Sequence, residues 1–390
     1  MRPTLPNRDT RSPRRARSGG FSLIELMVAL VLGLIVTGAV ISTFISVHSA
    51  SNDTAGIAEL ADNGRIALDI LQQTLRSAGY MACNSTLRQV VAPGLSPTPL
   101  TGDFTEALSG YEASGSDPGS ALTLQALPAG DSSQGDWDST PELGGALDSS
   151  VISEGNMSNA LPIAGSDVIA VHTTYSQIEP VYTTADTGAN TVDVQSTTGL
   201  AAGQIAVISN CANSMVDEIQ GINGSTVSFV QPFGETFASG AQIGVVDTFV
   251  FYIGKGTDGD GALYSYSLGG NPTFTNPPAE IAPDIENMQI LYGVDTTGSL
   301  AASEYVTADQ LANAVASNPN CAPIAGTGGV EFNCVVSVKI ALLAASPLGA
   351  IPKPTAARTF NLLGTRVTAP IDTRMRQVFE TTISLRNTTN

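Results

Sequence analysis

The stretch "SGGFSLIELMVALVLGLIV", Ser18 to Val36, decides how this chain is organised. Two glycines precede an apolar run that extends from Phe21 to Val47 with Glu25 as its only charged residue. A run of this length exceeds the roughly 20 helical residues that cross a bilayer core. A charge near the bilayer centre costs roughly 2.5 to 3.5 kcal/mol on insertion scales, so an intramembrane carboxylate is by default functional. We therefore expect Glu25 to have a partner.

The residues before the apolar run are strongly basic. Six arginines and one acid fall among the first 20 residues, and the arginines are Arg2, Arg8, Arg11, Arg14, Arg15 and Arg17. The positive-inside rule places this end in the cytoplasm, so the chain after about residue 50 faces the periplasm or the exterior. No clear A-x-A-like cleavage site follows Val47, which disfavours an ordinary secretory signal. A simple membrane anchor stays open as the alternative.

The next 30 residues continue a helical pattern. Apolar residues recur at three- and four-residue spacing, at Ile57, Leu60, Ala61, Ala67, Leu68, Leu71, Leu75 and Ala78. Asp69 and Gln72 are expected on another face, and Gly79 is a suitable stop. Phe21 to about Ala78 therefore predicts one helix of roughly 58 residues, or roughly 87 Å. Its second half is amphipathic, and its first half is apolar all round and needs lipid or similar helices around it.

Composition narrows the class of protein. Only 13% of the 390 residues are charged, the chain has 39 Gly and 22 Pro, and the formal net charge is −18. Because the basic residues concentrate at the N-terminus, the remainder is more acidic still, which argues against non-specific nucleic-acid binding by its broad surface. The composition indicates a β-rich extracytoplasmic protein with long connections.

The junction "GGFSLIELMVAL" resembles the leader-peptide junction of type IV prepilins. The resemblance implies that a prepilin peptidase cuts between Gly20 and Phe21 and N-methylates the new amine of Phe21. It also implies that Glu25 meets the N-terminal amine of a neighbouring subunit and sets the register of assembly. A carboxylate and an ammonium attract far more strongly in a low dielectric than in water.

From about residue 166 onward, the chain is predicted to consist mainly of β-strands. Short segments rich in β-branched and aromatic residues alternate with turn signals, namely "DVIAVHTTY", "TVDVQST", "QIAVISN", "TVSFV", "QIGVVDTFVFYIG", "ALYSYSL", "NMQILYGV", "VVSVKIALLAAS" and "MRQVFETTISLR". Four stretches are similar to PilW-like minor pilins: "NGRIALDILQQTLRSAGYMAC", "IENMQILYGVD" with "SEYVTADQL", "VVSVKIALL" and "DTRMRQVFETTISLRN". Residues 84 to 160 show no such similarity.

The predicted fold is α+β and pilin-like, with a long N-terminal helix packed on a large antiparallel β-rich domain. The predicted organisation is a basic leader over 1–20, a helix over 21–80, a loop-rich variable region over 81–160 and a periplasmic body over 161–390. Within the helix, 21–47 would cross the membrane or form a filament core, and 48–80 would be amphipathic.

Four cysteines permit three disulfide pairings outside the cytoplasm. We favour Cys321 with Cys334, which closes the short loop "CAPIAGTGGVEFNC" and stabilises by about 3 kcal/mol in the chain-entropy model. Cys83 with Cys211 would then pin the end of the helix to the body. A zinc site is disfavoured because no C-x-x-C occurs and the chain has only two histidines, His48 and His172.

The loop "GKGTDGDGALY" holds the one weak candidate for a calcium site, Asp258 and Asp260. Its spacing does not fit the EF-hand. A solvated hairpin turn is the stronger interpretation, and we assign no metal and no cofactor.

No enzyme motif is present: the chain has no G-x-S-x-G, no Walker A loop and no H-E-x-x-H. The resemblance to PilW-like minor pilins implies a non-enzymatic minor pilin of the type IV pilus that helps to start pilus assembly and indirectly serves twitching motility, adhesion or DNA uptake. Its expected partners are other minor pilins, the major pilin, the prepilin peptidase and the inner-membrane assembly platform. It would sit in the inner membrane before assembly and at the cell surface afterwards. A type II secretion pseudopilin and a pilus-tip adhesin that binds through residues 84–160 remain open.

Overall fold

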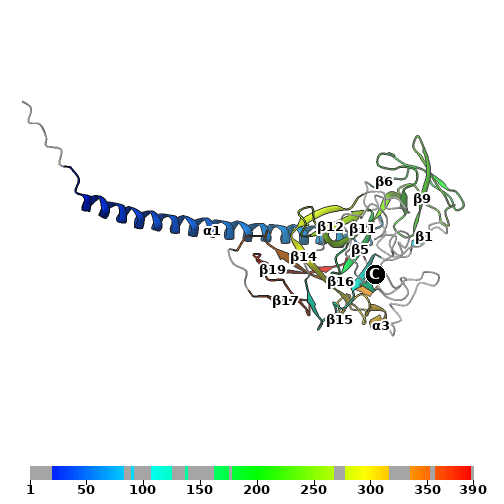
Figure 1. Ribbon diagram of the computed structural model, residues 1–390. Coiled ribbons are helices and arrows are strands. Elements are labelled where there is room, and N and C mark those ends of the chain that lie inside the picture. The colour runs from blue at the N-terminus through cyan, green and yellow to red at the C-terminus, as the bar shows by residue number, and fades with distance from the viewer. Residues whose placement is uncertain are drawn as a thin grey trace, which may run out of the picture. The chain divides into compact units, whose positions relative to one another are not determined.

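The computed structural model describes residues 20–82, 89–91, 107–124, 137–138, 162–174, 178–267, 277–315, 334–351 and 356–387. The chain divides into two compact units, Met1–Asn52 and Asp53–Asn390. The helix α1 (Leu23–Arg76) belongs to both (Figure 1). The predicted helix is confirmed, and each of its ends lies two residues inside the predicted bounds.

In the described part of the first unit, α1 exposes its apolar side chains on every face. Leu23, Leu34 and Phe44 are each at least 70% exposed. The most apolar 18-residue window of α1 has a mean hydropathy of 2.6 and none of it is buried. By length and composition this helix can cross a membrane.

In the second unit, the C-terminal part of α1 packs through a stripe of small and apolar residues. Its buried residues are Gly56, Leu60, Asn63, Gly64, Ala67, Leu71 and Leu75. Ile57, predicted to be in the core, is 51% exposed. Gln72, predicted on another face, instead donates through Nε2 to Thr381 Oγ1 at 2.7 Å. The contact face is therefore rotated toward the glycines, because a backbone without side chains allows the sheet to come closer.

Gly64 lies at a point where α1 and the sheet approach closely, and a substitution there tests this approach. A Cβ added there would lie 2.5 Å from the ring of Phe379, so Gly64→Ala is expected to destabilise the body by about 1 to 3 kcal/mol despite the better helix propensity of alanine. Denaturant unfolding of the full chain measures this. Phe379→Leu in the same chain should recover part of the loss, and equal losses with and without the ring would contradict the steric explanation.

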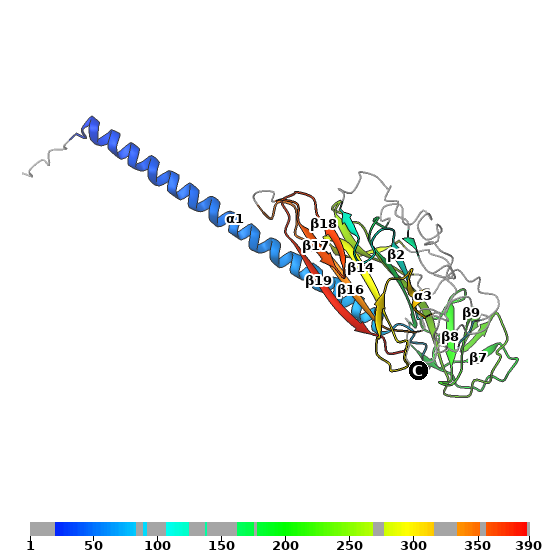
Figure 2. The same ribbon diagram turned by 90° about the horizontal axis from the view of Figure 1, so that it is seen from below.

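A four-stranded antiparallel sheet lies against this part of α1 (Figures 1 and 2). Its order is β15 (Glu304–Val306), β14 (Ile285–Val294), β16 (Val335–Ala345) and β19 (Arg376–Ser384). A three-stranded sheet packs against it through Leu343, Leu362 and Val367, and consists of β17 (Thr359–Leu362), β18 (Thr365–Thr368) and β3 (Ala121–Thr123). Leu311 and Val315, in the short helix α3 (Leu311–Val315), join the core that includes α1.

The remaining strands of the described chain form one large sheet. Its main path is β4 (Trp137–Asp138), β2 (Leu108–Ala113), β5 (Val168–Thr174), β11 (Gln242–Lys255), β8 (Ile205–Ser209), β9 (Ser214–Asn223), β10 (Thr226–Phe229) and β7 (Thr191–Asp193). Beside this path lie β1 (Gln89–Val91), β6 (Glu179–Pro180), β12 (Gly261–Ser267) and β13 (Ala279–Pro283).

The long strand β11 takes part in two separate cores. Its first residues, 242–245, pair with β8, and residues 246–251 pair with β5. Residues 178–245 form a module with its own core, in which Phe229, Phe233 and Phe237 pack edge to face. We call this the 178–245 module.

The structure confirms the α+β fold class, with a long apolar N-terminal helix and a large antiparallel β-rich domain. All nine segments predicted as strands contain one. The sequence interpretation missed the described strands β6, β9, β13, β15, β17 and β18. It also treated 81–160 as loop-rich, although the described residues of that region include the wholly buried strand β2. The domain boundaries themselves stay predictions.

Candidate functional site

The N-terminal end of α1 contains the glutamate half of a capping box. The backbone N–H of Ser22 donates to Glu25 Oε2 at 3.0 Å, and the N–H of Leu26 donates to the carbonyl of Ser22 at 3.1 Å. This is the S-x-x-E pattern, in which a glutamate three residues after the cap satisfies an otherwise unpaired backbone donor. The spacing Ser22-x-x-Glu25 was visible in the sequence, but the sequence interpretation assigned Glu25 an assembly role alone.

Capping does not neutralise the charge of Glu25. Residues 21–52 contain no lysine or arginine, and Glu25 is exposed on a helix whose neighbouring side chains are apolar and exposed. A carboxylate in lipid or in a helix bundle needs an opposite charge to offset its desolvation. A positive charge must therefore come from outside this segment or from a newly created N-terminus.

The predicted processing point is sterically open. Phe21 is 88% exposed, and a Cβ added to Gly20 would have nothing within 4 Å. Residues 1–19, most of the predicted leader, lie outside the described residues. Cleavage and N-methylation stay predictions.

Two of the four predicted disulfide cysteines fall in the described chain. Cys211 and Cys334 are both disulfide-bonded, and the described residues include no free thiol. Cys83 and Cys321 lie outside the described residues. The favoured pairing, Cys321 with Cys334 and Cys83 with Cys211, therefore stays a prediction.

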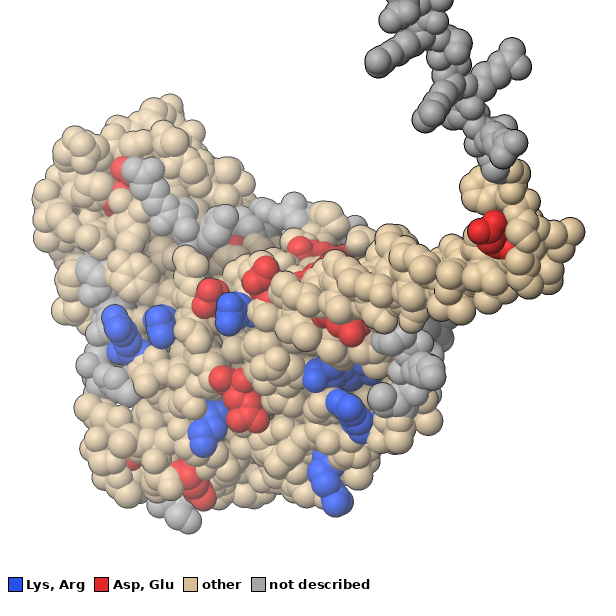
Figure 3. Space-filling view, turned by 90° about the vertical axis from the view of Figure 1, so that its left-hand side faces the viewer, with Lys and Arg blue, Asp and Glu red and all other residues tan. Residues whose placement is uncertain are grey.

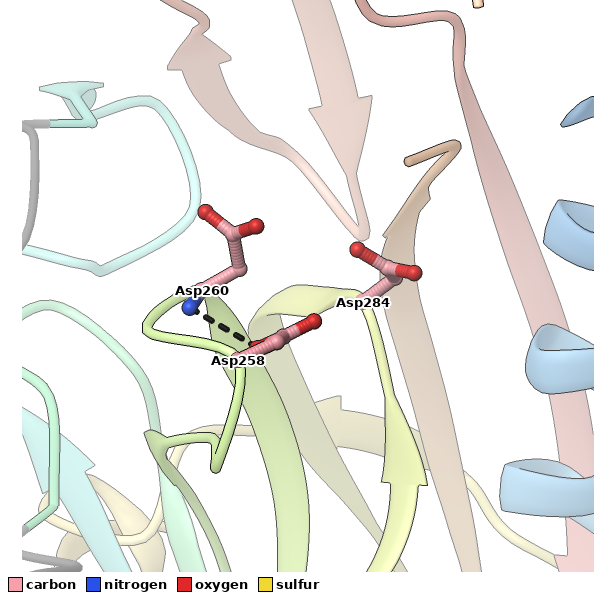
Figure 4. A group of neighbouring side chains, drawn as sticks. All are labelled: Asp258, Asp260 and Asp284. Atoms are coloured by element: carbon pink, nitrogen blue, oxygen red, sulfur yellow. Dashed lines mark hydrogen bonds between the residues drawn. The ribbon is translucent and has the colours of Figure 1, made fainter. Parts of the chain in front are cut away.

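The acidic loop gains a third carboxylate from a different part of the sequence. Asp258 and Asp260 lie in the β11–β12 hairpin, where the N–H of Asp260 donates to Asp258 Oδ1 at 3.0 Å. Asp284, between β13 and β14, brings a carboxylate to the same place (Figure 4). One ligand oxygen from each of the three lies within 4.8 Å of the others.

A buried arginine already occupies this cluster. Arg374 Nη1 donates to Asp284 Oδ1 at 3.0 Å, Nη2 pairs with Asp260, and the arginine side chain is only 4% exposed. Burial raises the pKa of Asp284 to about 6 against the attraction of Arg374. A metal ion would have to compete with the guanidinium for two of its three ligands. The arrangement therefore favours a structural ion-pair cluster below an exposed turn.

A second arginine ties the same region together. Arg376 reaches both oxygens of Glu286 at 2.6 and 2.8 Å and both oxygens of Asp372 at 2.8 and 2.5 Å. These bidentate, partly buried pairs are the strong kind of charge-assisted hydrogen bond. A pocket beside them is lined in part by Arg358, Arg374 and Arg376. Two of these three arginines are already neutralised, which makes the pocket a poor anion receptor.

Neither histidine is placed for catalysis. His172 is fully buried, with Nδ1 2.9 Å from Thr248 Oγ1. His48 stacks on Phe44, with ring centroids 6.2 Å apart, on the apolar helix of the first unit. On the face of the molecule in Figure 3, charged side chains are scattered over a largely uncharged surface. The described residues present no open acid–base constellation.

Comparison with known proteins gives two family matches. Residues 250–387 match the family described as Type IV Pilus-assembly protein W. Residues 15–41 match the Prokaryotic N-terminal methylation motif. The first match covers β12 to β19 and most of the second half of β11, and the second covers Gly20, Phe21 and Glu25. No curated protein matches the chain.

Two solved structures show local similarity. A type IV-like pilin from Thermus thermophilus is 17% identical, with 48% of this chain and 86% of that chain covered and a TM-score of 0.22. The Gp54 tailspike of an Acinetobacter baumannii bacteriophage, in complex with a capsular saccharide, is 15% identical with a TM-score of 0.18. That match covers 20% of this chain and only 15% of the tailspike chain. Both TM-scores are too low to support a common fold.

Proposed function

Because the chain is a PilW-like type IV pilin with a prepilin motif, we propose that it is a minor pilin needed to start pilus assembly. The observation that carries this proposal is the exposed apolar helix with one capped but unneutralised carboxylate, Glu25, directly after the motif. A body of this size can cover only part of such a helix, so the rest requires lipid before assembly and other helices afterwards. Twitching motility, adhesion or DNA uptake would depend on it indirectly.

The proposed sequence of events rests on the methylation motif and on the charges around it. A prepilin peptidase cuts after Gly20, which removes the basic leader and frees the amine of Phe21 as a positive charge at the start of the helix, and it then methylates that amine. That ammonium and the Glu25 carboxylate of a neighbouring subunit then neutralise each other in a low dielectric. Docking is favourable only in the register that brings the two groups together, so the pair selects the register.

The proposed partners and location fit this mechanism. Before assembly the helix crosses the inner membrane, with its basic end in the cytoplasm and the body in the periplasm. The inner-membrane platform would deliver it to other minor pilins and then to the major pilin. The protein performs no chemistry of its own in this scheme, in keeping with a structural role in the pilin family.

Intact mass and N-terminal sequencing of the membrane-extracted protein test the proposal. With prepilin peptidase present, the chain is expected to begin at Phe21. Its measured mass should exceed the mass calculated from the sequence after Gly20 by that of one added methyl group. Without the peptidase, or in Gly20→Ala, it should keep its leader. An uncut chain in the presence of an active peptidase, or cleavage beyond Val47, would show that the helix is an anchor or an ordinary signal.

A type II secretion pseudopilin would share the same processing, so a second measurement separates the two. The match to a pilus-assembly family favours the pilus. Deletion of the gene is expected to abolish surface pili and twitching while exoprotein secretion continues. Lost secretion with normal piliation would assign the protein to the secretion system.

A further inference from the structure

Two buried carboxyl groups face each other where the large sheet meets the four-stranded sheet. Glu112 is on β2 and Asp167 directly precedes β5, and Ser116 lies in the turn after β2. The three residues are 4%, 2% and 0% exposed, respectively. Glu112 Oε2 is buried and has no hydrogen-bond partner.

Asp167 joins strands from both sheets. Its Oδ1 accepts from the N–H of Ala113 on β2 at 3.0 Å, and its Oδ2 accepts from the N–H of Ile290 on β14 at 2.8 Å. The backbone around it makes further links to β14, because Asn287 Nδ2 donates to the carbonyl of Gly165 at 2.7 Å and the N–H of Asp167 donates to the carbonyl of Met288 at 2.9 Å. We call residues 162–167 the strap. Strap and β2 are outside the region that matches the pilus-assembly family, whereas β14 is inside it.

The hydroxyl of Ser116 shows where a proton must sit. Its Oγ lies 2.6 Å from the carbonyl of Ala113, 2.9 Å from Glu112 Oε1 and 3.2 Å from Asp167 Oδ1. A serine hydroxyl donates one hydrogen bond and can accept others. Since the shortest contact, to the carbonyl of Ala113, takes the hydrogen of the Ser116 hydroxyl, at least one of the two carboxyl groups has to donate to Ser116 Oγ. Glu112 is the donor, because Asp167 already accepts two backbone N–H groups that stabilise its ionised form.

Among the described residues, the charges that act most strongly on Glu112 and Asp167 are all those of acids. The chain has no lysine or arginine between Arg88 and Lys255. After Asp167, the charges that act on Glu112 are those of Asp309 and then Asp117, and Tyr292 of β14 also faces the pair. Burial, followed by the charge of Asp167, raises the pKa of Glu112 to about 10, and burial also raises the pKa of Asp167.

We propose that Glu112 and Asp167 hold one proton between them, on Glu112, and that this proton fastens β2 and the strap to β14. Loss of the proton places two like charges beside each other in a buried site, and the strands separate. The part of the body outside the family-matching region is then held less firmly in alkaline surroundings than in acidic ones. This device is independent of how the N-terminal helix assembles.

The direction of the pH dependence follows from the raised pKa of Glu112. The folded chain keeps a proton that the unfolded chain releases near pH 4.5. The resulting stability is complete below about pH 4.5 and is lost progressively as the pH rises from there through about 10. For one proton, the folding equilibrium constant falls about tenfold for each pH unit in this window.

Urea unfolding of the full chain in detergent at pH 6, 7 and 8, followed by near-ultraviolet circular dichroism, tests the proposal. Glu112→Gln keeps the shape of the side chain and a donor for Ser116. Its folding equilibrium constant should therefore depend on pH less steeply than that of the parent, by about tenfold for each pH unit. Glu235→Gln, which alters an exposed acid of the 178–245 module, is the matched control and should keep the parental slope. A parental slope in Glu112→Gln would overturn the proposal.

Infrared spectroscopy provides a readout that does not need the variant to fold. The parent at pH 8 should show the carbonyl band of a protonated carboxylic acid, which disappears on titration to higher pH together with the native circular dichroism. The absence of that band from the folded parent at pH 8 would overturn the proposal.

Discussion

Pili from cells that express Glu25→Ala are expected to contain at least about 100-fold less of this subunit than pili from parental cells. The variant removes the carboxylate that would neutralise a neighbour's N-terminal ammonium, and an uncompensated buried charge costs about 3 to 5 kcal/mol. Leader processing should continue, because the cut precedes Phe21 and Glu25 is four residues further on. Immunoblots of sheared pili and of membranes, normalised to total protein, measure both outcomes.

Glu25→Gln separates the charge of Glu25 from its role in the capping box. The amide oxygen of glutamine can still accept from the N–H of Ser22, as the carboxylate does at 3.0 Å, but glutamine carries no charge. If charge pairing sets the register, Glu25→Gln should be excluded from pili as completely as Glu25→Ala. Normal incorporation of the glutamine variant would instead show that Glu25 acts by starting the helix.

Arg374→Met is expected to lower the free energy of unfolding of the body by about 3 to 5 kcal/mol at pH 8. The arginine side chain is 4% exposed, and methionine would leave Asp284, itself 5% exposed, without its ion pair. Without the guanidinium the pKa of Asp284 should rise further above its usual value, so more of Asp284 would be protonated at pH 5. The loss should therefore be smaller at pH 5 than at pH 8.

Urea unfolding of the full chain at both pH values measures this effect. Arg366→Met changes an exposed arginine on β18 and should shift the free energy of unfolding by no more than about 0.5 kcal/mol. Asp284 has a φ of 58°, a conformation that asparagine tolerates, so adding Asp284→Asn to Arg374→Met should recover part of the stability. Equal losses at pH 5 and pH 8 would contradict an electrostatic role.

The long helix and most strands could be predicted because their signals are local. Hydrophobic spacing defined α1 to within two residues at each end, and β-branched runs marked β5, β8, β11, β14 and β16. The helix face was predicted less accurately. Counting apolar residues placed Ile57 in the core, whereas the contact depends on Gly56 and Gly64, which a hydrophobic pattern does not register.

Only those parts of the candidate site whose residues lie close together in the sequence could be predicted. Gly20, Phe21 and Glu25 lie within six residues, so their spacing carried the signal. Asp258 and Asp260 were found because they share a loop, but Arg374 pairs with Asp260 across 114 residues and with Asp284 across 90. The pair of Glu112 and Asp167 likewise depends on the pairing of β2 with β5. A single sequence does not reveal which distant acids and bases will meet.

The two cores that share β11 determine how the body responds to tension. A pull on the 178–245 module along the axis of β11 acts on the hydrogen bonds to β5 and β12 in shear, since both neighbours run antiparallel beside it. Bonds loaded in shear carry the force together, whereas bonds peeled from one end break in turn. The module is thus connected to the rest of the body by a mechanically stiff joint, and a force applied to the module would reach the four-stranded sheet with little stretching in between.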